Sequence, residues 1–269
     1  MLLNGQPATD ISLQDRGLAY GDGLFETILI CAGRPLLFDE HLARLQRGCA
    51  VLGLDPDLAA LQSELASVLS QTAARDVVLK ISLTREASGR GYRPLTTACN
   101  RILTLHPRPD YRTRAPDQGI AMFVCRQRLA RQPVLAGLKH LNRLEQVLAS
   151  REWPDDSFLE GLMLDTEGLV IEGTRSNLFA VIGGQLLTPT LDNCGVNGVM
   201  RTWLLQSFGK VACERMFTLG QLRDASEIFI CSSVIGVWPV TQLQQGGELH
   251  RYDIGPHTRQ AQAWFHALI

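Results

Sequence analysis

The sequence lacks the features of membrane-spanning, secreted and nucleic-acid-binding proteins. No stretch approaches the roughly 20 consecutive apolar residues of a membrane-spanning helix, and the first residues have neither a cationic start nor an apolar signal core. The formal net charge is only −1, so the chain has no general attraction for nucleic acid or an anionic membrane surface. We therefore expect a soluble, cytoplasmic protein with no nucleic-acid and no membrane partner.

The cysteines lack the patterns of a disulfide framework or a zinc knuckle. There are seven, an odd number, spread along the chain, and no two of them form C-x-x-C. We expect buried, reduced thiols and no bound metal.

What the chain does have is enough apolar sequence to fill substantial cores. Its 269 residues, 45% of them hydrophobic, suit one large domain or two modest ones. A hairpin, two helices and two further strands are expected in the first part: a hairpin at 23–38, a helix capped by Asp39 and ended by Gly53, a helix opened by Asp55-Pro56, and strands near 76–85 and 100–106. This pattern predicts a smaller N-terminal α/β sandwich domain over residues 1–110.

Prolines predict a break before the second part of the chain. Pro107, Pro109 and Pro116 interrupt regular structure, and we place an interdomain linker at 111–118. The rest, residues 119–269, predicts many short strands and few helices, which suits a barrel-like domain better than a doubly wound sheet. The fold class we predict is α+β, with two domains.

One lysine is distinguished by the segment around it. Residues 137–147 read G-L-K-H-L-N-R-L-E-Q-V, in which Lys139 is followed by leucines at helical spacing: Leu141, Leu144 and, just beyond, Leu148. The spacing predicts a helix over 141–152 with its apolar side toward a core and Lys139 at its start. A lysine in that position is ordinarily solvated, but a partly desolvated one is suited to covalent catalysis.

Of two later segments, the first contains an acidic residue and the second contains the start of a helix. Residues 171–179 read I-E-G-T-R-S-N-L-F, which places Glu172 at the end of an apolar strand. Residues 194–201 read C-G-V-N-G-V-M-R, in which Gly195 and Gly198 frame the beginning of a helix whose first N–H groups suit a phosphate. Each feature also has an ordinary interpretation, as a surface carboxylate and a simple turn.

Together these segments resemble the branched-chain/D-amino-acid aminotransferase-like (fold type IV) family of pyridoxal-phosphate enzymes. The resemblance implies the two-domain fold, pyridoxal 5′-phosphate as cofactor, and a homodimer with active sites near its interface. It implies that Lys139 holds the cofactor covalently and carries protons, and that Glu172 keeps the pyridine nitrogen protonated. It also implies a set of phosphate-binding residues: Arg44, Val199, Met200 and either Ser232 or Ser233.

The resemblance also implies a set of residues that contact the substrate. Thr27, in G-D-G-L-F-E-T (21–27), matches a proton donor of the lyases in the family. The loop G-R-G-Y (89–92) supplies Arg90 and Tyr92, and Arg101 offers another cation for a dicarboxylate substrate. A strand threonine is also a common β-former, and Arg90 could equally be solvated in a flexible loop.

Within the family, G-R-G-Y and the segment around Lys139 favour a lyase that releases pyruvate and leaves an aromatic amine. An aminotransferase for D- or branched-chain amino acids is the alternative, because it shares Lys139, Glu172 and the phosphate site. A non-catalytic protein for a phosphorylated ligand would use the helix start at Gly198 and leave Lys139 and Glu172 without a role.

Overall fold

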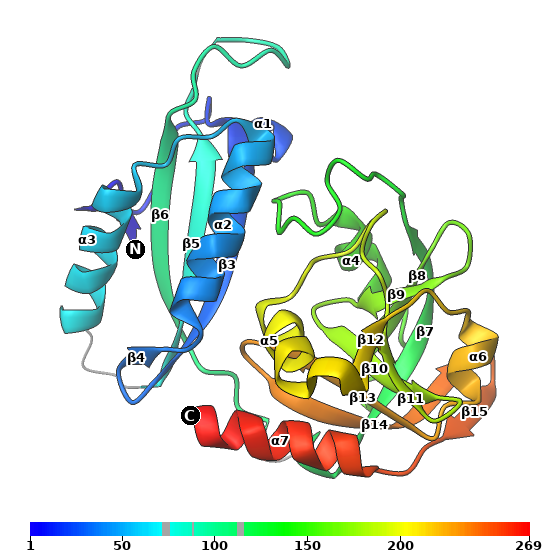
Figure 1. Ribbon diagram of the computed structural model, residues 1–269. Coiled ribbons are helices and arrows are strands. Elements are labelled where there is room, and N and C mark those ends of the chain that lie inside the picture. Colours follow the sequence, from blue (N-terminus) through cyan, green and yellow to red (C-terminus); the bar gives the residue numbers. More distant parts are fainter. Residues whose placement is uncertain (72–75, 88, 112–115) are drawn as a thin grey trace. The chain divides into compact units, whose positions relative to one another are not determined.

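The computed structural model describes residues 1–71, 76–87, 89–111 and 116–269 (Figure 1). The chain divides into two compact units, each combining helices with a sheet, which confirms the α+β class. The first unit is Met1–Pro109 with Leu138–Asn142, and the second is Asp110–Gly137 with Arg143–Ile269. The short segment around Lys139 therefore belongs to the first unit, whereas the sequence placed it in the second domain. Of the predicted linker at 111–118, residues 112–115 lie outside the described residues.

In the first unit, the described residues form a six-stranded sheet with the order β2-β1-β6-β5-β3-β4. Its strands are β1 (Leu2–Leu3), β2 (Gln6–Pro7), β3 (Gly23–Cys31), β4 (Arg34–Pro35), β5 (Val77–Arg85) and β6 (Cys99–Pro107). The predicted hairpin and both later strands are confirmed, whereas β1 and β2, with two residues each, carry no alternation that could have predicted them.

Helices α2 (Phe38–Leu52) and α3 (Leu58–Gln71) lie beside this sheet (Figure 1). Their apolar side chains pack against one of its faces. Gly53 ends α2 in the left-handed conformation, as predicted. The prediction that Asp39 caps α2 is wrong, because Leu37 occupies the cap position and Asp39 lies in the first turn, where its charge still favours the helix dipole. A five-residue helix, α1 (Arg16–Tyr20), precedes β3 and was not predicted.

The described residues of the second unit form a nine-stranded sheet with the order β12-β11-β10-β13-β14-β7-β8-β9, to which β15 adds by pairing with β14. The strands are β7 (Ile120–Leu129), β8 (Phe158–Asp165), β9 (Val170–Gly173), β10 (Asn177–Ile182), β11 (Gln185–Thr188), β12 (Ala212–Glu214), β13 (Glu227–Ser232), β14 (Gly236–Gln245) and β15 (Glu248–Arg251). These strands confirm the many short strands that were predicted for residues 119–269.

This sheet curls on itself. β9 and β10 are joined by only residues 174–176, and the Gly173 N–H donates to the Ser176 carbonyl at 2.7 Å. Yet the hydrogen-bonded path from β10 to β9 passes through β13, β14, β7 and β8. Three linking residues cannot span a flat sheet of that width, so the strands must curve round, and the predicted barrel-like architecture is confirmed.

The helices of the second unit are short: α4 (Leu144–Ala149), α5 (Val199–Phe208), α6 (Leu219–Arg223) and α7 (Pro256–Leu268), with the 3-10 helices η2 (Pro116–Gln118) and η3 (Gly209–Val211). The predicted helix over 141–152 is reduced to α4, and the prediction that its leucines face a core is wrong. Leu144 is 75% exposed and Leu148 48% exposed, while Ala149 is the buried residue of α4. Periodicity shows that one side of a helix is apolar but not which surface covers it.

The cysteines and helices test two further expectations. All seven cysteines lie in the described part of the chain and are free thiols; six are buried, and Cys213 is exposed, contrary to prediction. Among the described helices, none is long and apolar enough to cross a membrane.

Candidate active site

Lys139 is held by strand pairing rather than by a helix. The Phe25 N–H donates to the Lys139 carbonyl at 2.9 Å, and the Leu141 N–H donates to the Gly23 carbonyl at 3.1 Å. Between these bonds, His140 forms an antiparallel bridge with Leu24. Residues 139–141 therefore pair with β3 through a short antiparallel bridge. This pairing fixes the backbone of Lys139 more firmly than a frayed helix start would.

Two glycines of G-D-G make this pairing possible. Gly21 has a φ of +66°, and its carbonyl accepts a hydrogen bond from the Asn142 amide at 3.1 Å. A Cβ atom at Gly23 would overlap the Leu83 carbonyl oxygen and lie 2.8 Å from the Leu141 side chain. Only glycine at these positions lets the Lys139 segment approach β3 closely.

The side chains on one face of β3 gather around Phe25. The Lys139 ammonium lies 4.4 Å from the centre of the Phe25 ring, and the Lys80 ammonium lies 5.4 Å from it. Thr27, half-buried, is two residues along from Phe25 and directly opposite Lys80 in the β3–β5 pairing. Because alternate residues of a strand share a face, the structure brings Thr27, Lys80 and Lys139 to the same side of the sheet.

Arg44 is buried on α2, where it pairs with Glu26 of β3. The Arg44 Nε donates to one Glu26 carboxylate oxygen at 2.8 Å, and Nη2 donates to the other. His41, fully buried one helical turn earlier, shares the second oxygen through Nδ1 at 2.6 Å. The ordinary interpretation of Arg44 as an exposed helix residue is therefore wrong, and the cluster of Glu26, His41 and Arg44 was missed.

The charges of this cluster set its ionisation. Burial would raise the pKa of Glu26, but the charge and hydrogen bonds of Arg44, with His41, outweigh it and hold the pKa at about 2. Burial lowers the pKa of His41, and the charges of Arg44 and Lys139 add to that effect against the attraction of Glu26. Glu26 is therefore an anion paired with Arg44 at neutral pH, beside a neutral imidazole. The only sequence signal is the spacing of His41 and Arg44, which puts them on one side of a helix.

The predicted substrate cations lie in different places. Arg101 donates to the Glu64 carboxylate from Nε at 3.0 Å and from Nη2 at 2.7 Å, and it stands opposite Leu83 on the face covered by α2 and α3. That is the opposite face from Thr27, so the prediction that Arg101 meets the same substrate is not supported. Arg90 and Tyr92 are exposed in their loop, Tyr92 at 86%.

In the second unit, Glu172 lies near the end of β9, as predicted, and is buried. Its Oε2 accepts a hydrogen bond from the Val196 N–H at 2.8 Å. Gly195 has a φ of +86°, and a Cβ there would press against Ile171 and Glu172. The glycine thus lets the loop before α5 lie against the carboxylate.

The same loop leads to the first turn of α5. Gly198 is the N-cap residue of α5 and makes no side-chain cap hydrogen bond, and the first N–H groups of the helix include those of Val199 and Met200. Asn177, which sequence reasoning missed, donates to the Val196 carbonyl at 2.9 Å and would overlap a Cβ at Gly198. Its position at the beginning of β10, in S-N-L-F, is the signal that could have revealed it.

Asn177 also connects this loop to the predicted serines. It pairs with Cys231, the neighbour of Ser232 at the end of β13. Ser232 Oγ accepts a hydrogen bond from the Ile235 N–H at 3.4 Å, and Ser233 is buried. Asn177 thus links the loop before α5 to the strand that ends at Ser232.

Comparisons with known proteins identify the family to which the chain is similar. Residues 23–243 match the family described as amino-transferase class IV. The chain is 35% identical to aminodeoxychorismate lyase of Vibrio harveyi over 97% of each chain, and 28% identical to D-alanine aminotransferase of Bacillus licheniformis over 94% of this chain and 89% of that one. A solved 4-amino-4-deoxychorismate lyase from Pseudomonas aeruginosa has a TM-score of 0.92 and 46% identity, covering 99% of this chain and 98% of that one. Because the match covers most of the chain and the relatives span nearly its whole length, this protein belongs to the class IV aminotransferase family.

Proposed function

We propose that this protein is a pyridoxal-phosphate-dependent lyase that converts 4-amino-4-deoxychorismate to 4-aminobenzoate and pyruvate, a step of folate biosynthesis. The observation that carries the reaction type is the 46% identity with the solved lyase over 99% of this chain. Conservation of a fold alone would not distinguish a lyase from an aminotransferase. The binding of the cofactor and the transfer of protons are therefore argued from individual residues.

The loop 195–198 of the second unit fits pyridoxal phosphate. Glu172 is a buried carboxylate held by the Val196 N–H, and α5 begins three residues later, with a glycine as its N-cap residue. Side chains at Gly195 and Gly198 would fill the space beside Glu172 and Asn177, and both positions carry none. A carboxylate for a pyridinium nitrogen and a helix start for a phosphate are thus joined by one short loop.

Individual residues have distinct roles toward the cofactor. Glu172 keeps the pyridine nitrogen protonated through a charge-assisted hydrogen bond. The N–H groups of Val199 and Met200 bind the phosphate, together with a hydroxyl of Ser232 or Ser233. Arg44 is the guanidinium that the family resemblance assigns to the phosphate, and Glu26 fixes its orientation through two hydrogen bonds.

Lys139 and Thr27 carry the protons. When bound, pyridoxal phosphate supplies an electron sink that makes the ring proton next to the substrate amine acidic. Lys139 would hold the cofactor covalently, and its amine would take that proton. The bond from the ring to the enolpyruvyl oxygen then breaks, and Thr27 or Lys139 protonates the departing enolpyruvate to give pyruvate. The second product is the aromatic ring of 4-aminobenzoate, whose formation favours the reaction.

Arg90 and Tyr92 recognise the substrate, Arg90 by charge toward a carboxylate and Tyr92 by its ring and hydroxyl. Arg101 is left out because it lies on β6, two strands away from β3 and Lys139, where Glu64 binds it.

We also propose that the protein is a homodimer. On α4 the exposed residues Leu144, Val147 and Leu148 recur at helical spacing and form an apolar stripe, as expected of a surface that a second copy covers. Light scattering should give twice the chain mass, whereas a monomer at micromolar concentration would contradict the proposal.

The function is tested by supplying purified protein with 4-amino-4-deoxychorismate and no 2-oxo acid. A lyase should release pyruvate and 4-aminobenzoate in equal amounts over many turnovers. An aminotransferase, the less supported alternative, requires a 2-oxo acid for each cycle. Turnover of D-alanine with 2-oxoglutarate, together with no pyruvate from aminodeoxychorismate, would overturn the proposed function.

A further inference from the structure

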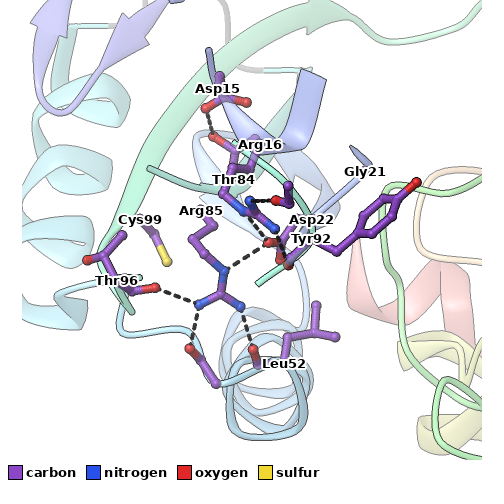
Figure 2. Close-up of polar contacts among 12 residues, drawn as sticks. Asp15, Arg16, Gly21, Asp22, Leu52, Thr84, Arg85, Tyr92, Thr96 and Cys99 are labelled. Carbon is purple, nitrogen blue, oxygen red and sulfur yellow. Dashed lines mark hydrogen bonds and ion pairs between the residues drawn. The ribbon is translucent and has the colours of Figure 1, made fainter. Parts of the chain in front are cut away.

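A buried arginine, Arg16, holds the backbone of the Arg90 loop. From α1, its Nη1 donates to the Gly91 carbonyl and its Nη2 to the Tyr92 carbonyl, each at 2.8 Å. Its Nε donates to the Asp22 carboxylate at 2.9 Å. Figure 2 shows this guanidinium among Asp22 and Tyr92, and Arg16 itself is only 3% exposed. Every nitrogen of the guanidinium is thus engaged, and two of the three bind main-chain atoms of one loop.

The loop Gly89–Tyr92, the clamped loop, is exposed to solvent, whereas Arg16 is buried. Its side chains are all exposed, and Gly89 and Gly91 have φ values of +84° and +88°. A segment with two such glycines has many conformations available when nothing holds it. Arg16 therefore restricts a loop whose own side chains contribute little burial.

Helix α1 is anchored to the sheet on its other side. Asp15 caps α1 by accepting from the Leu18 N–H at 3.0 Å, and its other oxygen accepts from the Thr84 hydroxyl at 2.6 Å and from Asn100 at 2.9 Å. Tyr20, at the end of α1, lies under the Arg16 guanidinium and meets the Tyr92 ring edge to face. The clamped loop is thus connected through α1 to β5 and β6.

Asp22 joins Arg16 to a second buried arginine, Arg85. The Arg85 Nε donates to the same Asp22 oxygen at 2.9 Å, while its Nη atoms bind the carbonyls of Leu52, Gly53 and Thr96 (Figure 2). Burial would raise the pKa of Asp22, but the hydrogen bonds and charges of Arg85 and Arg16 hold it below its usual range. Arg85 supports the end of α2 and the chain near Thr96, and Arg16 alone of the two contacts the clamped loop.

We propose that Arg16 is a positioning residue for substrate recognition: by fixing the carbonyls of Gly91 and Tyr92 it holds Arg90 and Tyr92 in the conformation that binds the substrate carboxylate. This rests on the proposed function of Arg90. The geometry requires arginine, because a lysine ammonium is a single point donor and cannot bond Asp22 and two separate carbonyls in one plane. Arg16→Lys keeps the charge and the apolar stem, so it removes the clamp while retaining most of the packing.

Tryptic cleavage reports the clamp without reference to activity. In residues 86–96, Arg93 precedes proline and resists trypsin, so the Arg90–Gly91 bond is the one tryptic site. Cleavage needs local opening of the backbone, which Arg16 opposes. We expect trypsin to cut the Arg90–Gly91 bond of Arg16→Lys about tenfold faster than that of the unaltered protein. Mass spectrometry of the peptides over time measures this rate. The matched control is Arg85→Lys, which loses the same kind of contacts to Asp22 and to carbonyls outside the clamped loop; cleavage at Arg90 should change less than twofold.

Kinetics then test whether the clamp serves recognition. Arg16→Lys should raise the KM for aminodeoxychorismate roughly tenfold and leave kcat within about twofold, since a displaced Arg90 weakens binding but not proton transfer. In an Arg90→Ala background the same change should alter KM less than twofold, because Arg16 acts through Arg90. A purely structural role would lower stability and activity equally in both backgrounds.

The outcomes separate this inference from the proposed function. Equal tryptic cleavage of Arg16→Lys and the unaltered protein overturns the clamp, and an unchanged KM overturns its role in substrate recognition. A KM effect that persists at full size without Arg90 shows that Arg16 does not act through it, and likewise overturns the positioning role. If the unaltered protein releases no pyruvate, the proposed function fails, and the cleavage rates still decide the clamp. Should Arg16→Lys not fold, Asp22→Asn weakens the same contact and should accelerate the same cleavage.

Discussion

The Phe25 N–H donates to the Lys139 carbonyl at 2.9 Å, while the Lys139 ammonium lies 4.4 Å from the centre of the Phe25 ring. Phe25 therefore fixes the backbone of Lys139, and the face of its ring attracts the lysine's positive charge. The same strand carries Thr27 on that face and Glu26 on the other. β3 is thus the element that organises the first unit's share of the proposed site.

Replacing Glu172 by glutamine should separate cofactor electronics from cofactor binding. Glutamine can still accept the Val196 N–H, so the loop before α5 should stay in place, but it cannot stabilise a pyridinium charge. We expect full cofactor occupancy and a kcat lower by on the order of a hundredfold. Absorbance titration measures occupancy, and full turnover at full occupancy would show that Glu172 is not the nitrogen's partner.

Thr27→Val should test the hydroxyl apart from the shape of the side chain. Valine is β-branched like threonine and suits the strand, so the fold of β3 should be unaffected. If the hydroxyl donates the proton to enolpyruvate, kcat should fall about a hundredfold with little change in KM, and Thr27→Ser should retain most of the activity. Equal kcat in the serine and valine variants would leave Lys139 as the donor.

Gly23→Ala should damage the Lys139 segment because the new methyl group meets a main-chain oxygen, which cannot move aside as a flexible side chain can. We expect a loss of about 3 kcal/mol in the free energy of unfolding, measured by urea denaturation. Gly220→Ala is the control, since it lies exposed in α6 with only Thr218 within 4 Å, and should be neutral or stabilising by up to ~1 kcal/mol. Similar effects of the two changes would contradict the close approach at Gly23.

The Glu26 cluster predicts a specific dependence of stability on pH. The pKa of Glu26 is about 2 in the folded protein, below its ordinary value of 4.5, so its ionisation stabilises the fold above about pH 4.5 and that contribution is lost as the pH falls toward 2. Glu26→Gln should be less stable at pH 7, because Arg44 then lacks its carboxylate. Its free energy of unfolding should approach that of the unaltered protein between pH 4.5 and 2. Parallel curves over that range would contradict the pairing.

Much of the fold was accessible from the sequence because it depends on local patterns. The strands around Glu172 and the helix start at Gly198 follow from apolar runs and glycine positions, which act over a few residues. The setting of Lys139 was not accessible, since residues 139–141 pair with a strand more than a hundred residues earlier. The same holds for Glu26 with Arg44 and for Arg101 with Glu64, because charge pairs between distant elements leave no periodic signal.

The identity of the cofactor lysine tests the account most directly, and the chain makes that test simple because it contains only three lysines: Lys80, Lys139 and Lys210. Borohydride reduction of the protein with pyridoxal phosphate should fix a pyridoxyl group on Lys139 and block trypsin there, so that the label appears in the peptide 132–143. Lys80 shares the Phe25 ring with Lys139 and is therefore the informative competitor. A label on Lys80 or Lys210, or no visible absorbance band and no label at all, would contradict the account.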